Sequence, residues 1–289
     1  MYTNFRPKIR SRHPSHDELR KKGVLPLFPF RSVIRFGSVT DFPDTVTNGG
    51  NRIEINTIQS IKNSSSKLEM KRCFAENNIK TADWWTVNEN NEFLYKNGVV
   101  EEENISIGIQ ELPYPIISKH VFGSRGTGNK KHDNAEQLQE WLSNKKASLN
   151  KYIFEKFYSY NREYRLHVTK DGCFYTCRKV LKQDTPQENR WFRNDENSNW
   201  LLEENESFDK PVNWDKIVEE SVNSLKAVGL DVGAVDLRIQ SAKNNEGKER
   251  KNPEYIVVEI NSAPSFGEIT LQKYINELSK LLINKSNEK

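Results

Sequence analysis

The sequence contains few cysteines and no long hydrophobic run. Its 289 residues include three cysteines, an odd number that agrees with a reducing compartment. Cys173 and Cys177 lie four apart in one predicted strand, on one face and without partners at zinc spacing, so we expect small core residues rather than metal ligands. There is no run of eighteen apolar residues, and no apolar segment follows the basic N-terminus. These absences argue against a membrane span and a secretory signal, and predict a soluble, cytoplasmic protein.

Hydrophobic residues are also scarce. They make up 35% of the chain and the mean hydropathy is −0.82, whereas aromatic residues reach 10% and include six tryptophans. This composition is typical of a globular protein with a very polar surface. The length allows a sizeable core, either in one large α/β unit or in two or three lobes.

The net charge of +4 is concentrated at the N-terminus. Residues 1–35 carry nine Lys and Arg against two acids, a local charge of +7, so the remaining residues sum to −3. A basic arm of this kind suits contact with nucleic acid or another polyanion. A solvated tail that docks on the body of the protein is the alternative.

Three oxygen-bearing side chains in the C-terminal third of the chain are spaced so that strand pairing would bring them together. Glu259 interrupts an apolar run over 255–260 and Asn261 follows it by two positions, so both side chains leave a strand on the same face. Asp236 lies at the centre of a second apolar strand over 233–239, and a polar hairpin loop joins the two. Antiparallel pairing would bring Asp236 across from Glu259. Carboxylate and amide oxygens suit Mg²⁺ that also holds phosphate; the alternative is three solvent-facing residues at strand ends.

A glycine-rich stretch over 121–130 predicts a mobile loop. Gly123, Gly126 and Gly128 could let backbone amides wrap phosphate oxygens, and Arg125 could neutralise them. The spacing fits neither the P-loop nor the dinucleotide fingerprint, so the loop alone is a weak signal.

The segment 163–169 alternates ionisable and apolar residues. Glu163, Arg165 and His167 fall on one face of the predicted strand, and Tyr164, Leu166 and Val168 on the other. The ionisable row is either a ligand-facing surface or a solvated outer face.

Other periodic segments complete the expected architecture. Residues 1–28 lack clear periodicity apart from one helical turn capped by Ser15. A polar insertion covers 183–207. Helices are expected over 56–62, 66–77, 134–144, 214–229 and 269–282, and further strands over 32–36, 52–55, 79–87, 115–120, 152–158 and 172–182.

This ordered series resembles the ATP-grasp superfamily, in the branch of D-alanine ligases and of the glutamate ligases that modify a ribosomal protein. The resemblance runs from about residue 56 to the C-terminus. Lys67, between Ser66 and Leu68, is similar to the first phosphate-binding lysine of the family, and Lys119 to the second. The loop that closes over the phosphates would comprise Gly123, Ser124, Arg125, Gly126 and Gly128.

The same resemblance implies roles for residues further along the chain. Glu155, Lys156 and Phe157 are similar to the hinge that grips adenine, and Glu163 to the acid that binds the ribose hydroxyls. Arg178 is placed beside the γ-phosphate, as a catalytic residue with Lys119. Asp236, Glu259 and Asn261 match the metal ligands.

The resemblance implies an α/β protein with an ATP-grasp fold in three parts. Residues 1–65 would form a basic arm and a truncated N-terminal region, 66–154 the small lobe with the glycine loop, and 155–289 the large lobe with the metal site. The implied activity uses ATP and two Mg²⁺ ions. A substrate carboxylate attacks the γ-phosphate, and an amine captures the acyl phosphate to give an amide, ADP and phosphate.

The chain departs from the family mainly on the substrate side. About 55 residues precede the matching region, enough for two strands at most, and His120 stands where many relatives have proline. Residues 190–200 add cations and aromatic rings that could line a nucleotide or nucleic-acid acceptor site or form a packed surface lobe. The style of the chain resembles ATP-grasp proteins of bacteriophages, which would place it in the host cytoplasm. A kinase and a nucleic-acid-binding protein with a vestigial nucleotide site remain the alternatives, and both substrates and the oligomeric state stay open.

Overall fold

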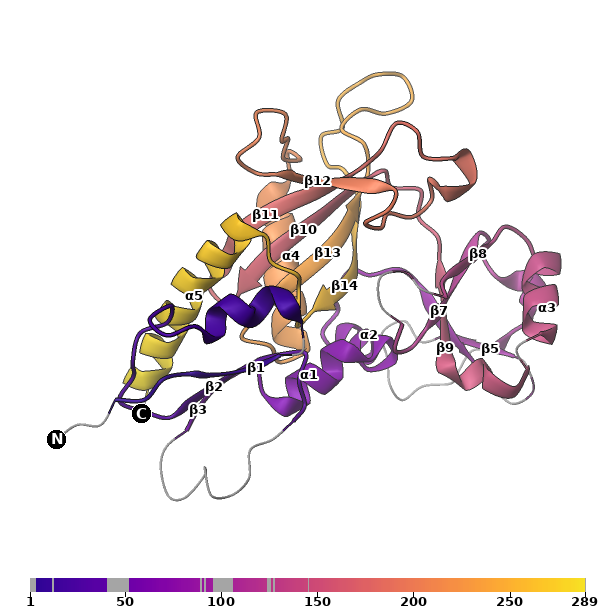
Figure 1. Ribbon diagram of the computed structural model, residues 1–289. Helices are drawn as coiled ribbons and strands as arrows, with labels where there is room; N and C mark the ends of the chain where they lie inside the picture. The colour runs from indigo at the N-terminus through magenta and orange to yellow at the C-terminus, as the bar shows by residue number, and fades with distance from the viewer. Residues whose placement is uncertain are drawn as a thin grey trace.

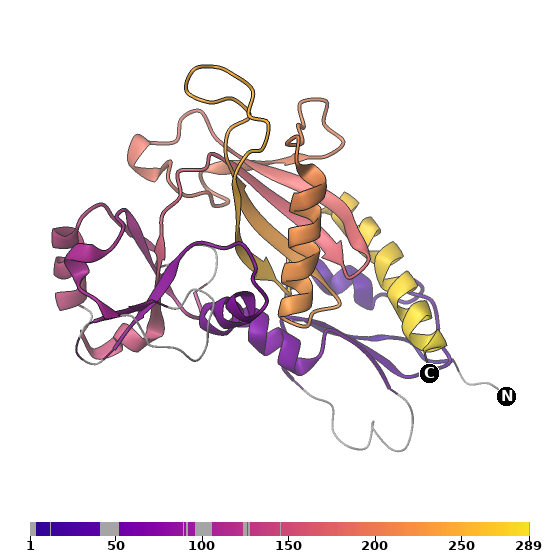
Figure 2. The same cartoon turned by 180° about the vertical axis from the view of Figure 1, so that it is seen from behind.

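Three β-sheets and the helices around them make up the described part of the chain (Figures 1 and 2). The computed structural model describes residues 4–11, 13–40, 52–88, 90, 92–95, 106–123, 126, 128–144 and 146–288. Within these residues, no helix is both long enough and apolar enough to cross a membrane. The expected α/β fold class is confirmed.

A five-stranded antiparallel sheet forms the centre of the molecule. Its strands, in spatial order, are β12 (Ser198–Leu202), β11 (Gly172–Leu181), β10 (Arg162–Thr169), β13 (Val232–Ile239) and β14 (Tyr255–Asn261). Helix α4 (Trp214–Ala227) covers one face (Figure 2). Its apolar side, including Ile217 and Leu225, packs on Tyr164, Leu166 and Val168 of β10, as the alternation in the sequence predicted. The helix ends where Gly229 adopts a φ of +77°, a left-handed conformation that glycine takes without strain.

The second sheet belongs to a smaller lobe beside the first. Its order is β6 (Ser106–Ile107), β5 (Phe93–Tyr95), β4 (Trp84–Val87), β9 (Tyr152–Lys156), β7 (Ile116–His120) and β8 (Lys130–His132). Helix α3 (Ala135–Ser143) buries Leu138, Trp141 and Leu142 against this sheet. Short 3-10 helices lie at Ile109–Glu111 and Lys146–Lys151.

The helices α1 (Ile58–Ser65) and α2 (Lys67–Glu76) lie between the lobes in sequence but pack with the larger one. Ile61, Met70 and Phe74 are buried in the same core as β13, β14 and α4. The expected small lobe began at residue 66, whereas residues 66–76 contribute their apolar side to the large lobe. The spacing of apolar residues in the sequence of α2 indicated which face of the helix is buried. It did not indicate which sheet that face contacts.

The N-terminal residues form a third sheet, with parallel strands. Strands β1 (Lys8–Ser11), β2 (Ser32–Phe36) and β3 (Ile53–Ile55) lie in that order, and a 3-10 helix at Pro14–Arg20 connects the first two. Helix α5 (Glu268–Asn287) packs Tyr274, Leu278 and Leu282 on this unit (Figure 1). The expectation of two strands at most is therefore wrong. Residues 8–11 and 13–20 are part of the folded body, which favours the docked alternative over a free basic arm for this segment.

A β-bulge in β11 corrects the expected placement of two cysteines. The register shifts between His167 and Val168, so that Tyr175 lies opposite the first and Cys173 opposite the second, with Phe174 as the extra residue. Cys173 then packs in the core under α4, whereas Cys177 lies opposite Arg165 on the other face. Two residues four positions apart lie on the same face of a regular strand. A bulge between them places them on opposite faces.

Candidate functional site

A cleft of about 620 Å³ lies where the lobes meet. Both lobes and the N-terminal unit contribute to its walls, the last through His13 and Gly37, which lie just after β1 and β2. Among the site residues expected from the sequence, the cleft is lined by Lys67, Lys119, Gly123, Gly126, Glu155, Lys156, Phe157, Glu163, Asp236, Glu259 and Asn261. Residues separated by almost 200 positions in the sequence thus face one space.

The three proposed metal ligands meet as the strand pairing predicted. Strands β13 and β14 are antiparallel and Asp236 lies opposite Glu259. The amide nitrogen of Asn261 is 3.3 Å from Asp236 Oδ2 and 3.5 Å from Glu259 Oε1. Two carboxylates and one amide within this range form a donor set that suits a hard divalent cation. In the described residues no group of three or more His, Cys, Asp or Glu side chains could hold a metal, so an ion here would need the amide oxygen of Asn261.

The cleft-facing side of the central sheet carries charged residues in rows across the strands. One row places Glu163 of β10 opposite Lys179 of β11 and Arg238 of β13. Glu163 lies 3.2 Å from the Arg238 guanidinium and 4.0 Å from the Lys179 amine. The ionisable face expected for residues 163–167 therefore faces the cleft at its first position.

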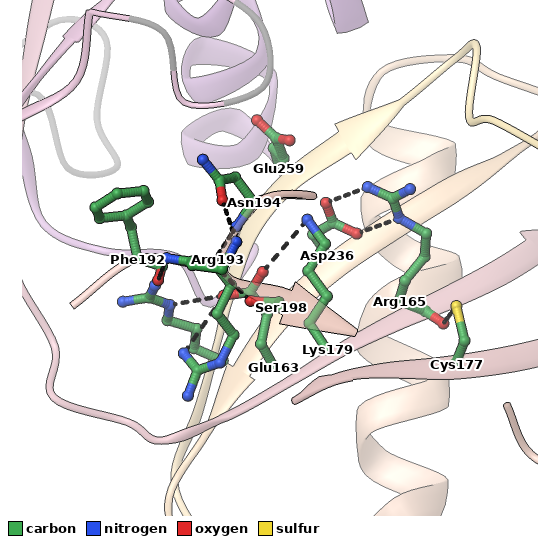
Figure 3. A network of polar contacts seen from close by, with 12 residues as sticks. Glu163, Arg165, Cys177, Lys179, Phe192, Arg193, Asn194, Ser198, Asp236 and Glu259 are labelled. Atoms are coloured by element: carbon green, nitrogen blue, oxygen red, sulfur yellow. Dashed lines mark hydrogen bonds and ion pairs between the residues drawn. The ribbon is translucent and has the colours of Figure 1, made fainter. Parts of the chain in front are cut away.

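The neighbouring row holds the best-formed ion pair of the cleft. Arg165 of β10 lies opposite Asp236 of β13, and its Nε and Nη2 donate to the two carboxylate oxygens at 2.7 and 2.8 Å (Figure 3). Burial would raise the pKa of Asp236, but the charge and hydrogen bonds of Arg165 more than offset burial and lower it.

The third row leaves the cleft. His167 is buried, and its Nδ1 lies 3.0 Å from the hydroxyl of Tyr274 on α5. Burial lowers the pKa of His167 to about 3, so the ring is neutral. Helix α5 thus covers the position that the alternation alone would have placed on the ligand-facing surface.

A buried ion-pair network lies on the small-lobe side of the cleft. Glu155 of β9 accepts from Lys119 at 2.6 Å and lies 3.4 Å from the Lys71 amine, which is fully buried. Burial lowers the pKa of Lys71 to about 8, although Glu155 acts in the opposite direction. For Glu155 itself burial would raise the pKa, and the two lysines outweigh burial and lower it. Glu155 therefore acts as a counterion that holds Lys119 beside the cleft, and Lys71 is a residue that the sequence analysis missed.

The other expected lysine sits where a helix begins. Lys67 is the first residue of α2, after the N-cap Ser66, whose hydroxyl accepts from the amide of Glu69. Its amine donates to the carbonyl of Gly123. Burial lowers the pKa of Lys67, and nearby Glu259 partly counters that effect. A helix N-terminus with a lysine is suited to an anion because the amides and the helix dipole are both positive there.

The glycine loop is only partly described. Gly126 and Gly128 have φ values of +74° and +78°, the left-handed region that favours glycine. Gly126 lines the cleft, whereas Gly128 does not. The expected residues Ser124 and Arg125 lie outside the described residues.

The hinge segment uses two of its backbone amides within the protein. The amides of Lys156 and Phe157 donate to the carbonyls of Asp83 and Pro115, at 2.9 and 2.8 Å. Contacts to a base at this wall would therefore involve other groups, among them the aromatic rings of Phe157 and Trp191, which both line the cleft.

Arg178 is not in the cleft. It lies on the α4 face of β11, where its guanidinium is 5.6 Å from the Tyr164 ring and pairs with Asp209. Its neighbour Lys179 lines the cleft instead. Because successive residues of a strand point to opposite faces, a match displaced by one residue reverses the side chain. The structure thus does not bring the expected catalytic arginine to the other site residues.

The insertion at residues 190–200 forms one wall of the cleft. Trp191, Arg193 and Trp200 all line it. Trp200 of β12 lies opposite Lys179 of β11. The Lys179 amine and the Arg165 guanidinium each lie 4.8 Å from the centre of the Trp200 ring. Arg193 lies 3.8 Å from Glu163 and also donates to the carbonyl of Asn161. This favours the site-lining alternative over a separate surface lobe.

The chain is similar to known proteins in its fold and not in its sequence. No model of a protein family matches the sequence, and no curated protein does either. The fold is similar to D-alanine–D-alanine ligase from Bacillus anthracis, with a TM-score of 0.56, 15% identity and coverage of 96% of this chain and 85% of that chain. The same enzyme complexed with ATP has a TM-score of 0.54 and 15% identity, and the match covers 87% of this chain and 76% of that chain. The ATP-grasp ligase PsnB complexed with minimal precursor has a TM-score of 0.56 and 12% identity, and the match covers 96% of this chain and 98% of that chain. At these identities the comparisons establish the fold.

Proposed function

We propose that this chain, which has the ATP-grasp fold, is an ATP- and Mg²⁺-dependent ligase that joins a carboxylate to an amine. One observation carries the proposal: Lys67 and Lys119 face the same cleft as Asp236, Glu259 and Asn261. Phosphoryl transfer needs positioning and charge neutralisation more than covalent help from the protein. Lysines on one side and metal ligands on the other supply both to a triphosphate.

The donor set fits a divalent cation, which would be held by Asp236, Glu259 and Asn261 and would neutralise phosphate charge. Lys119, held by Glu155, and Lys67, at the start of α2, would bind phosphate oxygens. Glu163 would accept from the ribose hydroxyls, and Phe157 and Trp191 would contact the base. Lys179 would take the γ-phosphate role that the family resemblance implies for Arg178.

The proposed reaction has two steps. A carboxylate oxygen of the substrate attacks the γ-phosphorus, the bond from that phosphorus to the β-phosphate oxygen breaks, and ADP leaves. The amine nitrogen then attacks the acyl carbon and forms the C–N bond, the bond to the phosphate oxygen breaks, and the amine loses a proton. Lys119 and Lys179 would stabilise the negative charge that develops during both steps.

The test measures ADP release and reaction products by mass spectrometry. The protein is incubated with ATP, Mg²⁺ and a panel of amino acids and short peptides, in pairs and singly, with GTP in parallel. A ligase makes an amide product and releases ADP rapidly only when an amine is present. A kinase forms a phosphorylated product from one substrate alone. Absence of ATP binding would reject both activities and favour a protein with a vestigial nucleotide site.

A matched pair of variants ties the activity to the proposed ligands. Glu259→Gln should abolish turnover, because it removes one of two carboxylates from the metal site. Glu254→Gln makes the same chemical change in an exposed residue that pairs with Lys80, and should leave turnover unchanged. Equal activity of the two variants would remove the metal assignment.

A further inference from the structure

Arg165 occupies both oxygens of a residue that the proposed function needs for a metal ion. The guanidinium donates to Asp236 Oδ1 and Oδ2 at 2.7 and 2.8 Å, and the two side chains are 13% and 9% exposed. A bidentate pair in a largely buried place is the strongest kind of side-chain ion pair. The third group at Asp236 is the Asn261 amide nitrogen, which also presents a donor.

A divalent cation and Arg165 therefore compete for the same carboxylate. Three of the roughly four lone-pair sites of Asp236 already accept hydrogen bonds, two from Arg165 and one from Asn261. The charge of a divalent cation also repels a guanidinium at this distance. Glu259 also faces this point without an ion pair of its own among the described contacts. Asp236 and Glu259 carry two negative charges, which one divalent ion would balance. With Arg165 still paired to Asp236, the same ion would add an excess positive charge, so its binding favours release of the arginine.

The arginine has a place to retreat to. Its guanidinium already lies 4.8 Å from the ring of Trp200, which is 37% exposed and lines the cleft. A cation over a tryptophan face is held by the charge distribution of the ring. Release from Asp236 would therefore leave Arg165 on Trp200, next to Lys179, which contacts the same ring.

We propose that Arg165 is the resident counterion of Asp236 and that a divalent cation displaces it onto Trp200. Arg165 is then a positioning residue: it keeps the buried carboxylate paired in the metal-free protein and sets the affinity of the metal site. The inference rests on the proposed function, since it takes Asp236 as a metal ligand.

The experiment is a calorimetric titration of the full chain with Mn²⁺, with and without a non-hydrolysable ATP analogue. Arg165→Met should bind Mn²⁺ about ten- to hundredfold more tightly than the wild type, because the ion no longer displaces a charge-assisted pair. Lys179→Met is the matched control. It removes the same charge from the same tryptophan, but Lys179 donates no hydrogen bond to Asp236 in the described structure and acts on it only through its charge. In the titration without nucleotide, its gain should therefore stay within about threefold.

Thermal unfolding supplies a second readout. Without metal, Arg165→Met leaves Asp236 unpaired and should unfold at a lower temperature, and saturating Mn²⁺ should restore the wild-type value. A purely structural role for Arg165 predicts the same loss of stability at every Mn²⁺ concentration. Arg165→Lys, which keeps the charge but not the bidentate contact, should fall between the wild type and Arg165→Met in Mn²⁺ affinity and offers a milder variant if the methionine form does not fold.

Two negative results have different meanings. If the wild type binds Mn²⁺ and Arg165→Met gains no more affinity than Lys179→Met, the exchange is rejected while the proposed function stands. If the wild type binds no Mn²⁺ even with the nucleotide analogue, the metal site itself is rejected, and the exchange with it.

Discussion

Glu155 is the residue whose loss should be most costly to stability near the cleft. Its carboxylate is 4% exposed and neutralises both Lys119 and Lys71. We expect Glu155→Gln to lower the free energy of unfolding by about 3 kcal/mol, because two buried amines lose their counterion. Deprotonation of Lys71, whose pKa burial already lowers to about 8, relieves part of the cost.

Urea denaturation monitored by fluorescence checks this value. Glu254→Gln breaks the exposed pair with Lys80 and should cost less than about 1 kcal/mol. Similar losses in the two variants would mean that Glu155 is not the counterion described above.

Adjacent residues of β11 offer a matched test of the site assignment. Lys179 lines the cleft, and Arg178 packs over Tyr164 on the opposite face. We expect Lys179→Met to lower kcat/KM at least about tenfold, since a charge near the phosphates is lost. Arg178→Met should leave kcat/KM within about twofold of the wild type and cost at most about 1 kcal/mol of stability. If steady-state assays show a larger loss of kcat/KM in Arg178→Met than in Lys179→Met, Arg178 would again be the candidate for the γ-phosphate role.

His16 makes stability depend on pH. It is buried, its Nε2 donates to the Pro264 carbonyl at 2.8 Å, and its Nδ1 lies 2.7 Å from the Ser11 hydroxyl. Burial lowers its pKa from 6.5 to about 4. Between these pKa values the unfolded chain binds a proton that the folded protein does not, so the free energy of unfolding decreases as pH falls from about 6.5 to 4.

The variant His16→Gln keeps a donor for the Pro264 carbonyl and removes the titration. The slope of the unfolding free energy against pH is proportional to the number of protons taken up on unfolding. We expect this number to decrease by up to one in this pH window. Burial also lowers the pKa values of His132 to about 4 and His167 to about 3, so a residual slope remains. An unchanged slope would show that His16 does not titrate on unfolding.

At the scale of elements, the sequence predicted the segments whose partners lie nearby. Strands β10, β13 and β14 alternate or run apolar as expected, and the hairpin between the last two fixed the meeting of Asp236 and Glu259. Strand β12 was missed because its polar segment gains order from pairing with β11. The bulge at Phe174 could not be predicted, because the alternation of residue types along β11 does not show where an extra residue is inserted.

The element most poorly predicted is β1. Its sequence, with Ile9 between basic residues, has no strand periodicity of its own, and it is ordered by the parallel partner β2. The pocket-side arginine at 165 was visible in the alternation, but its partner Asp236 depends on the register of two strands distant in sequence. Patterns within one segment do not contain that register.

Deleting residues 1–24 should therefore damage the fold. The deletion removes β1 and the buried side chain of Leu19, and Leu19→Ala alone should cost about 2–5 kcal/mol. The prediction that this basic segment contacts nucleic acid calls for Lys21→Gln with Lys22→Gln, which changes exposed residues only. A salt series with single-stranded DNA and RNA should show weaker binding for this variant at unchanged melting temperature if the contact exists.

At the scale of the whole molecule, the first and last segments share one core. Leu19, Ile34 and Phe36 are buried with Tyr274, Leu278 and Leu282 of α5. We expect a chain that stops at residue 267 to leave the N-terminal sheet unprotected in hydrogen exchange, because the helix that covers it is missing. The small lobe, with its own core around Trp85 and Phe154, should keep its protection. Full protection of β2 in the shortened chain would contradict this dependence.

This shared core has a consequence for synthesis on the ribosome. Strands β1 to β3 are translated before helix α5 and complete the burial of their apolar faces only when that helix has emerged, so these strands fold later than their place in the chain would suggest. The small lobe, whose strands lie between residues 84 and 156, has its own core, so we expect it to fold earlier. Until α5 has emerged, the nascent chain would carry strands β1 to β3 exposed, and they are the part that a chaperone would need to shield.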